Sequence, residues 1–208
     1  MEMGLVDLVK SSKVIAVIRA EGPETALRSA QACIEGGLKL IEITFSFSGA
    51  DKVISELSKG YDVVVGAGTV LNMDMARAAA AAGANFIVSP HTDRELIHYA
   101  KSRDLLVVAG ALTSSEIVNA WRLGADMVKL FPVKAVGGAS YIRAIKEPLP
   151  FVEVMTTGGV TLENFKEFLD AGATAVGLSS ALLGKNGSFE PETIYERAKW
   201  VTREINKV

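Results

Sequence analysis

One lysine, Lys129, stands in a strongly apolar run between Val128 and Leu130. Other lysines, such as Lys52 and Lys59, fall in polar segments where exposure to solvent explains their charge. An amine inside a buried strand must lose its hydration or find a partner. Because desolvation favours the uncharged amine, such a lysine can attack a ketone carbonyl as a nucleophile. The alternative is a structural ion pair with an inward carboxylate.

Glu42 poses the same problem with the opposite charge, within the apolar run 40–45. The alternation of side chains along a strand places Leu40, Glu42 and Thr44 on one face. If that face points inward, Glu42 can approach Lys129. A buried carboxylate beside an amine can take up and return protons as a general base and acid. It could equally serve only as the ionic partner of the lysine.

Small and hydroxyl-bearing residues follow several apolar runs. The segment from Gly66 to Thr69 predicts a tight turn that brings backbone close to a ligand, with the Thr69 hydroxyl available to a carboxylate. The pairs Gly158-Gly159 and Ser179-Ser180 predict a phosphate site made of glycine amides and the first turn of a short helix over 180–183. A plain turn, and packing or capping, are the alternatives.

Two further residues, Arg19 and Pro90, end apolar runs. Arg19 can bind a carboxylate or phosphate, or else form an ion pair at the rim, and Pro90 can shape the pocket. The only histidines are His91 and His98, and no metal-binding cluster is apparent. We therefore expect catalysis without a metal.

The elements that would position these residues recur at regular intervals. Short apolar runs alternate with helical segments, which indicates a parallel sheet buried on both faces. Eight such units favour a closed (β/α)₈ TIM barrel, a single domain over residues 1–208, rather than an open doubly wound sheet. In a barrel, chemistry lies where strands end, as the candidate residues do. The predicted strands are 13–19, 40–45, 62–65, 86–89, 105–109, 127–131, 151–155 and 175–178.

A second periodicity supports the barrel. Gly37, Gly83, Gly124 and Gly172 each stand between small or apolar residues just before the second, fourth, sixth and eighth strands. Each predicts a helix end in the left-handed conformation, and together they indicate a βαβα repeat. The sequence also predicts a helix opening at Pro23, helix N-caps at Thr161 and Ser114, an alanine-rich helix over 73–82 and a terminal helix over 191–208.

Composition narrows the function classes. The 208 residues are 49% hydrophobic and carry a net charge of −2 without a basic stripe, so we expect a packed core and no nucleic-acid partner. The single cysteine, Cys33, cannot form an internal disulfide, which suits a reducing cytoplasm. Neither a signal peptide within residues 1–10 nor an apolar run of about 18 residues is apparent, so we expect no export and no membrane insertion.

Five motifs occur in order at the predicted strand ends. They are Glu42-Ile-Thr-Phe, Gly66-Ala-Gly-Thr-Val, Ile87-Val-Ser-Pro, Lys129-Leu-Phe-Pro and Thr157-Gly-Gly-Val. This set resembles the 2-keto-3-deoxy-6-phosphogluconate (KDPG) and 4-hydroxy-2-oxoglutarate (KHG) aldolase family. The resemblance implies a class I aldolase that cleaves KDPG to pyruvate and glyceraldehyde 3-phosphate, and that can also cleave KHG to pyruvate and glyoxylate.

The resemblance also implies roles for individual residues. Lys129 matches the family's Schiff-base lysine and Glu42 its general acid and base. The keto-acid pocket would include Thr69 and Pro90, and the phosphate site would include Gly158, Gly159 and Ser180. A homotrimer is expected from the same resemblance.

One position departs from the family pattern. Many members carry an arginine four residues after the glutamate, where it binds the substrate carboxylate, and this chain has Ser46. Carboxylate binding would then fall to Thr69, backbone amides or Arg19. The galactonate epimer of KDPG is an alternative substrate. A phosphate-binding barrel isomerase or synthase and a non-enzymatic sugar-phosphate sensor are rival functions for a barrel of this kind.

Overall fold

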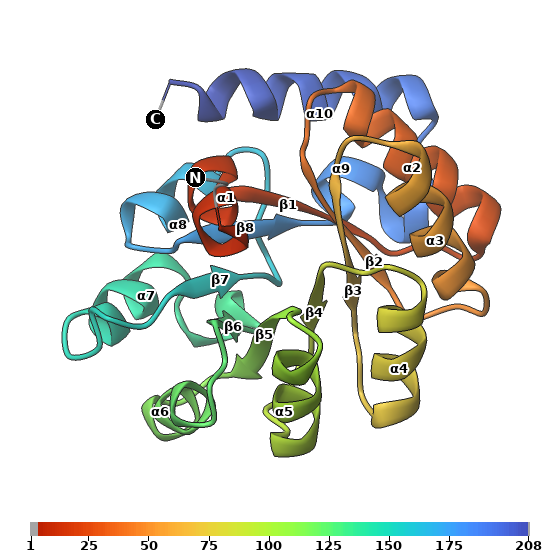
Figure 1. Ribbon diagram of the computed structural model, residues 1–208. Coiled ribbons are helices and arrows are strands. Elements are labelled where there is room, and N and C mark those ends of the chain that lie inside the picture. The colour runs from red at the N-terminus through yellow and green to blue at the C-terminus, as the bar shows by residue number, and fades with distance from the viewer. Residues whose placement is uncertain (1–3, 208) are drawn as a thin grey trace.

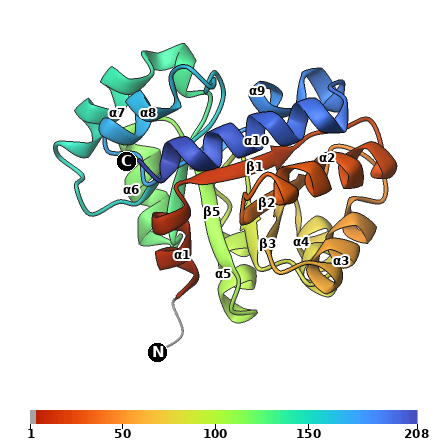
Figure 2. The same cartoon turned by 90° about the horizontal axis from the view of Figure 1, so that it is seen from above.

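The computed structural model describes residues 4–207, which form a single domain built around a closed barrel of eight parallel strands (Figures 1 and 2). The strands follow one another around the barrel in sequence order, and β8 pairs with β1. This confirms the predicted (β/α)₈ architecture. The strands are β1 Val14–Ile18, β2 Leu40–Thr44, β3 Val64–Gly68, β4 Phe86–Val88, β5 Leu106–Ala111, β6 Met127–Leu130, β7 Val154–Thr156 and β8 Ala175–Leu178.

Helices surround the barrel (Figure 2). They are α1 Leu5–Ser12, α2 Pro23–Glu35, α3 Ala50–Gly60, α4 Met73–Ala81, α5 Arg94–Ser102, α6 Ser114–Arg122, α7 Ala139–Lys146, α8 Phe165–Asp170, α9 Ser180–Leu183 and α10 Pro191–Ile205, with short 3₁₀ turns η1 Val133–Val136 and η2 Lys185–Gly187. Pro23 begins α2 and α4 covers most of 73–82, as predicted. Val208, the predicted end of the terminal helix, and residues 1–3 of the predicted domain lie outside the described residues.

Two apolar layers explain why the strands read as continuous hydrophobic runs. Outward side chains such as Ile41 and Ile43 join the helices in the larger core. Inward side chains such as Leu40, Phe86 and Met127 fill the barrel interior. Because every strand is apolar on both faces, a polar side chain inside it needs a separate explanation.

The four glycine signatures adopt the predicted conformation. Gly37, Gly83, Gly124 and Gly172 all have positive φ, between 88° and 101°. In each, the glycine N–H and the next N–H donate back to carbonyls of the preceding helix, as in Gly37 to Ile34 at 2.8 Å. The same helix ending therefore precedes β2, β4, β6 and β8, which confirms the repeat.

Strand β3 departs from the prediction, which ended it at residue 65 and placed Gly66 to Gly68 in a turn. The strand continues to Gly68, and Gly66 and Gly68 pair with Glu42 and Thr44 of β2. A Cβ on Gly66 would overlap the Phe86 ring. These glycines therefore leave room inside the barrel, and the positive-φ turn residue is Thr69.

The start of strand β7 and the starts of two helices also differ from the prediction. Phe151 is 51% exposed and precedes β7, which begins only at Val154. Thr161 does not cap a helix, because α8 begins after a turn in which the Asn164 side chain accepts from the Thr161 N–H. The cap of α6 is Thr113, whose reciprocal bonds with Glu116 outcompete the neighbouring Ser114.

The two terminal helices close the molecule. Helix α10 lies beside α2 in both views (Figures 1 and 2), where Thr202 donates to the Gly36 carbonyl at 2.9 Å. Helix α1 presents Val9 to the apolar side chains inside the barrel, so it covers the end at which the strands begin. Cys33 is fully buried, and burial raises the pKa of its thiol to about 12. No helix within residues 4–207 is long and apolar enough to cross a membrane.

Candidate active site

A cavity of about 500 Å³ opens where the barrel strands end. Its lining brings together eight of the nine residues that the sequence singled out: Arg19, Thr69, Pro90, Lys129, Gly158, Gly159, Ser179 and Ser180. A larger cavity of about 810 Å³ lies between α8 and α10 and contains none of them. Because chemistry in this fold occurs at the carboxyl ends of the strands, the smaller cavity is the candidate active site.

Lys129 projects from β6 into the barrel, between the paired neighbours Gly110 and Met155. It is 6% exposed, and its Nζ atom lies 5.3 Å from the centre of the Phe131 ring. No ion pair within 4.0 Å joins Lys129 to a carboxylate among residues 4–207. The structural ion pair considered from the sequence is therefore not formed.

Glu42 projects inward from β2 and is fully buried. Neither carboxylate oxygen has a hydrogen-bond partner among the described residues. Burial raises the pKa of Glu42, and the positive charges of Lys129 and Arg19 oppose that rise only in part. A Cβ on Gly68 would overlap Oε1, so the glycine makes room for the carboxyl group.

Arg19 and Thr69 form one side of the cavity. The Arg19 guanidinium donates to Thr69 Oγ1 at 3.3 Å. Thr69 has φ of 55°, a left-handed conformation that costs a β-branched residue about 1–3 kcal/mol. Such strain is typical of residues that the surrounding structure holds in place for binding. Ser46, where many family members carry arginine, is exposed, and its Oγ lies 2.7 Å from Thr44 Oγ1.

Gly158, Gly159 and α9 follow β7 and β8, and β8 pairs with β1, the strand that leads to Arg19. Both glycines have positive φ, and a Cβ on Gly159 would lie 2.5 Å from the Lys134 side chain. Only glycine therefore fits this turn. Helix α9 begins at Ser180, as predicted, and its first backbone N–H groups lack intrahelical partners. Bare backbone and a helix start together can bind an anion.

The structure adds residues to which the sequence assigned no role. Thr157 is 7% exposed and lines the cavity, and its buried hydroxyl has no hydrogen-bond partner among residues 4–207. Its place beside Gly158 was a signal for it. Lys185 and Asn186 also line the cavity, but they follow α9 in a loop that no strand pattern could place. Within the described residues, no group of three or more His, Cys, Asp or Glu forms a metal site.

Comparison with known proteins identifies the family. The model of the KDPG and KHG aldolase family matches residues 5–193. The chain belongs to this family. It is therefore an aldolase, a carbon–carbon lyase, as the sequence motifs implied.

Two curated relatives match the sequence of this aldolase over most of their own length. The 2-dehydro-3-deoxy-phosphogluconate aldolase of Treponema pallidum is 34% identical over 158 residues, 76% of this chain and 75% of that protein. The 2-dehydro-3-deoxy-6-phosphogalactonate aldolase of Escherichia coli is 34% identical over 180 residues, 85% of this chain and 87% of that protein.

A solved structure adds information on chemistry in a relative. The KDPG aldolase of Legionella pneumophila is 30% identical to this aldolase, with a TM-score of 0.86 over 94% of this chain and 97% of that one. That structure is described with pyruvate captured at low pH as a covalent carbinolamine intermediate. Membership in the aldolase family disfavours the isomerase, synthase and sensor functions.

Proposed function

We propose that this aldolase cleaves KDPG to pyruvate and glyceraldehyde 3-phosphate through a Schiff base on Lys129. The observation that carries the proposal is a buried amine, without an ion-pair partner among residues 4–207, that lines the cavity at the carboxyl ends of the strands. Its place in the lining lets the nitrogen meet the carbonyl of a bound keto acid, and the uncharged form of an amine is the nucleophile in Schiff-base formation. The scheme uses no metal or organic cofactor.

The covalent cycle divides one difficult cleavage into easier steps. The Lys129 nitrogen attacks C2 of the keto acid to give a carbinolamine, and loss of water gives a protonated imine. The imine accepts the electron pair of the C3–C4 bond as that bond breaks, and the C4 hydroxyl loses its proton. Glyceraldehyde 3-phosphate leaves. The remaining enamine gains a proton at C3, and hydrolysis releases pyruvate and the free amine.

Glu42 is the proposed proton carrier, acting through a water on the C4 hydroxyl. Its carboxyl group is fully buried, has no protein hydrogen-bond partner among the described residues and senses the charge of Lys129. A raised pKa keeps the carboxyl group closer to the pH at which it can both accept and return a proton. The same group can therefore serve cleavage and the later protonation steps.

The two ends of the substrate would bind to different groups of the cavity lining. Arg19 and Thr69 can bind the carboxylate. They would replace the arginine that many family members carry at the position of Ser46. Gly158, Gly159, Ser179 and Ser180 can bind the phosphate through backbone and hydroxyl groups, and Pro90 shapes the wall between them. Holding both ends orients C2 toward the amine.

Borohydride trapping tests the Schiff base. Sodium borohydride added with pyruvate should give a mass adduct on Lys129, and Lys129→Ala should lose the adduct and measurable turnover while remaining folded. Lys52→Ala, which removes an exposed lysine of α3, should retain both. Labelling of another lysine, or trapping that persists without Lys129, would refute the scheme.

Comparative kinetics test the substrate. Pyruvate release should be fastest from KDPG, with KHG as a slower second substrate of the same site. The galactonate epimer is the main competitor, because one curated relative carries that name. A higher kcat/KM for the galactonate epimer would reassign the physiological substrate without changing the chemistry.

We also propose that residues 1–208 act as one catalytic domain within a cytoplasmic homotrimer. Family resemblance supports the trimer, and the single buried thiol of Cys33 suits a reducing compartment. Light scattering should give three times the mass of one chain. A monomer mass would overturn the trimer and leave the active-site scheme standing.

A further inference from the structure

The lining of the active-site cavity has an uneven charge. Among the described residues that line it, Arg19, Lys129 and Lys185 are cationic and none is acidic. The proposed function uses Lys129 for covalent chemistry and Arg19 for the carboxylate. It assigns no role to Lys185. A bound phosphate would nevertheless carry roughly two negative charges into the same cavity.

The fold gives Lys185 a defined backbone position. It begins η2, directly after the end of α9, and Gly184 and Gly187 on either side have φ of 73° and 78°. The Ser188 N–H donates to the Lys185 carbonyl at 3.1 Å, and the Phe189 N–H donates to the Leu183 carbonyl at 2.9 Å. These bonds fold the backbone of the loop against the end of α9, while Lys185 itself is exposed.

No partner within the described chain neutralises Lys185. Among residues 4–207, no carboxylate lies within 4.0 Å of its ammonium group. A second cavity of about 200 Å³ adjoins the loop, and Glu21, Arg28 and Glu190 line it together with Lys185. The carboxylates of Glu21 and Glu190 compete with a phosphate for the Lys185 ammonium group, and the positive charge of Arg28 offsets part of their negative charge.

The anion site beside Lys185 lacks a formal charge of its own. Gly158, Gly159, Ser179 and Ser180 offer amide and hydroxyl groups, whereas Arg19 is directed toward Thr69. Hydrogen bonds in which one partner is charged are about twice as strong as neutral ones, so a phosphate dianion gains most from a nearby ammonium group. Lys185 is the cation of the described lining that remains for this role.

We propose that Lys185 is a specificity-determining residue, which binds the phosphate of the substrate and selects phosphorylated over unphosphorylated 2-keto acids. This inference rests on the proposed function, since it assumes a 2-keto acid phosphate in the cavity. Lys185 binds at the end of the substrate remote from the bond that breaks. It should therefore affect KM and leave the chemical step largely unchanged.

The test compares KDPG with its unphosphorylated counterpart, 2-keto-3-deoxygluconate, in Lys185→Ala, Lys185→Glu and Lys185→Arg. Lys185→Ala should raise KM for KDPG about tenfold, with kcat and the parameters of the unphosphorylated substrate nearly unchanged. Lys185→Glu should raise KM further, and Lys185→Arg should retain the preference. Competitive inhibition by inorganic phosphate should weaken in parallel in the first two variants.

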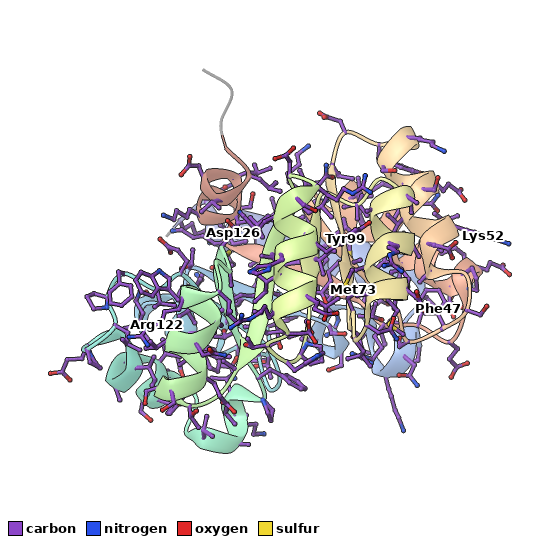
Figure 3. The ribbon with its side chains drawn as sticks, turned by 60° about the horizontal axis from the view of Figure 1, so that its bottom comes forward. Phe47, Lys52, Met73, Tyr99, Arg122 and Asp126 are labelled. Atoms are coloured by element: carbon purple, nitrogen blue, oxygen red, sulfur yellow. The ribbon has the colours of Figure 1, made fainter. Side chains whose placement is uncertain are left out.

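Lys52→Ala is the matched control, since Lys52 is exposed on α3 and projects from the outer surface of the molecule (Figure 3). An equal loss of kcat/KM on both substrates in Lys185→Ala would indicate a structural role for the loop and overturn the proposal. An unchanged KM for KDPG would overturn it as well. Borohydride trapping of pyruvate needs no phosphate. Its absence from the wild-type protein would instead refute the Schiff-base function.

Discussion

At the scale of single residues, the site places two groups of opposite charge inside a barrel whose interior is filled mainly with apolar side chains. Lys129 and Glu42 are both almost fully removed from solvent, and neither is neutralised by a direct contact within the described residues. Such an arrangement costs stability, because a buried charge without a close partner loses hydration without full compensation. Binding of a ligand with an electrophilic carbonyl would use both groups.

Glu42→Gln should lower kcat by about 10²–10⁴, the usual contribution of a positioned acid or base. The wild-type kcat should also decline with falling pH at values above the ordinary glutamate pKa of about 4.3, because burial raises the pKa of Glu42. A pH–rate profile measures both effects. An acid limb at the ordinary glutamate pKa would contradict the assignment.

The same substitution should increase thermal stability at neutral pH. A raised pKa means that folding takes up a proton between about pH 4.3 and the pKa of folded Glu42, so stability declines as pH rises through that window. Glutamine removes the cost of the buried charge above the window. The Tm advantage of Glu42→Gln should shrink toward about pH 4, and an advantage independent of pH would point to a different cause.

At the scale of elements, glycines inside the strands determine the shape of the site. Gly66, Gly68, Gly110 and Gly177 all occupy positions where a Cβ would overlap a neighbouring atom. The spaces are taken by Phe86, by the Glu42 carboxyl group, by the Pro90 backbone and by Thr157. Because glycine has no Cβ, these positions leave space inside the strands for the neighbouring groups.

Gly66→Ala should destabilise the protein by about 1–3 kcal/mol, since the new methyl group would overlap the buried Phe86 ring. Gly60→Ala is the matched control, because Gly60 ends α3 with no atom within 4 Å of a built Cβ. It should be neutral or stabilising by up to about 1 kcal/mol. Urea unfolding measures both, and equal effects would show that the interior is not close-packed at β3.

At the scale of the whole molecule, stability and chemistry occupy opposite ends of the barrel. Helix α1 packs Val9 against the inward side chains at the beginning of the strands, whereas the cavity lies beyond their ends. Asp126, which directly precedes β6, accepts from the Val107 N–H of β5 at 2.9 Å, at the end where these strands begin. Changes at the covered end should therefore affect folding more than turnover.

Val9→Ala should lower the free energy of unfolding by about 1–3 kcal/mol, because it removes methyl groups from a residue that is 2% exposed. Its kcat should equal that of the wild type at temperatures where both are folded. Ser11→Ala, an exposed change in the same helix, should stay within about 0.5 kcal/mol. A large loss of kcat in Val9→Ala would mean that the two ends are coupled.

The sequence by itself determined the architecture and most of the candidate site. Alternating apolar runs and four glycine helix ends specify eight βα units, since strand and helix periods and positive φ are local properties. An amine and a carboxylate in apolar runs are visible for the same reason. The sequence also placed eight of the residues that line the cavity, because strand ends of a barrel converge.

Only the tertiary structure decided which groups meet. The register of β2 with β3 pairs Gly66 with Glu42, and Gly68, two residues further along, leaves space for the Glu42 carboxyl group. The continuation of β3 through its glycines is favoured by pairing rather than by local preference. The loop after α9 brings Lys185 into the cavity, although nothing in its local sequence marks it. Contacts between distant segments depend on barrel closure, which no local pattern of residues encodes.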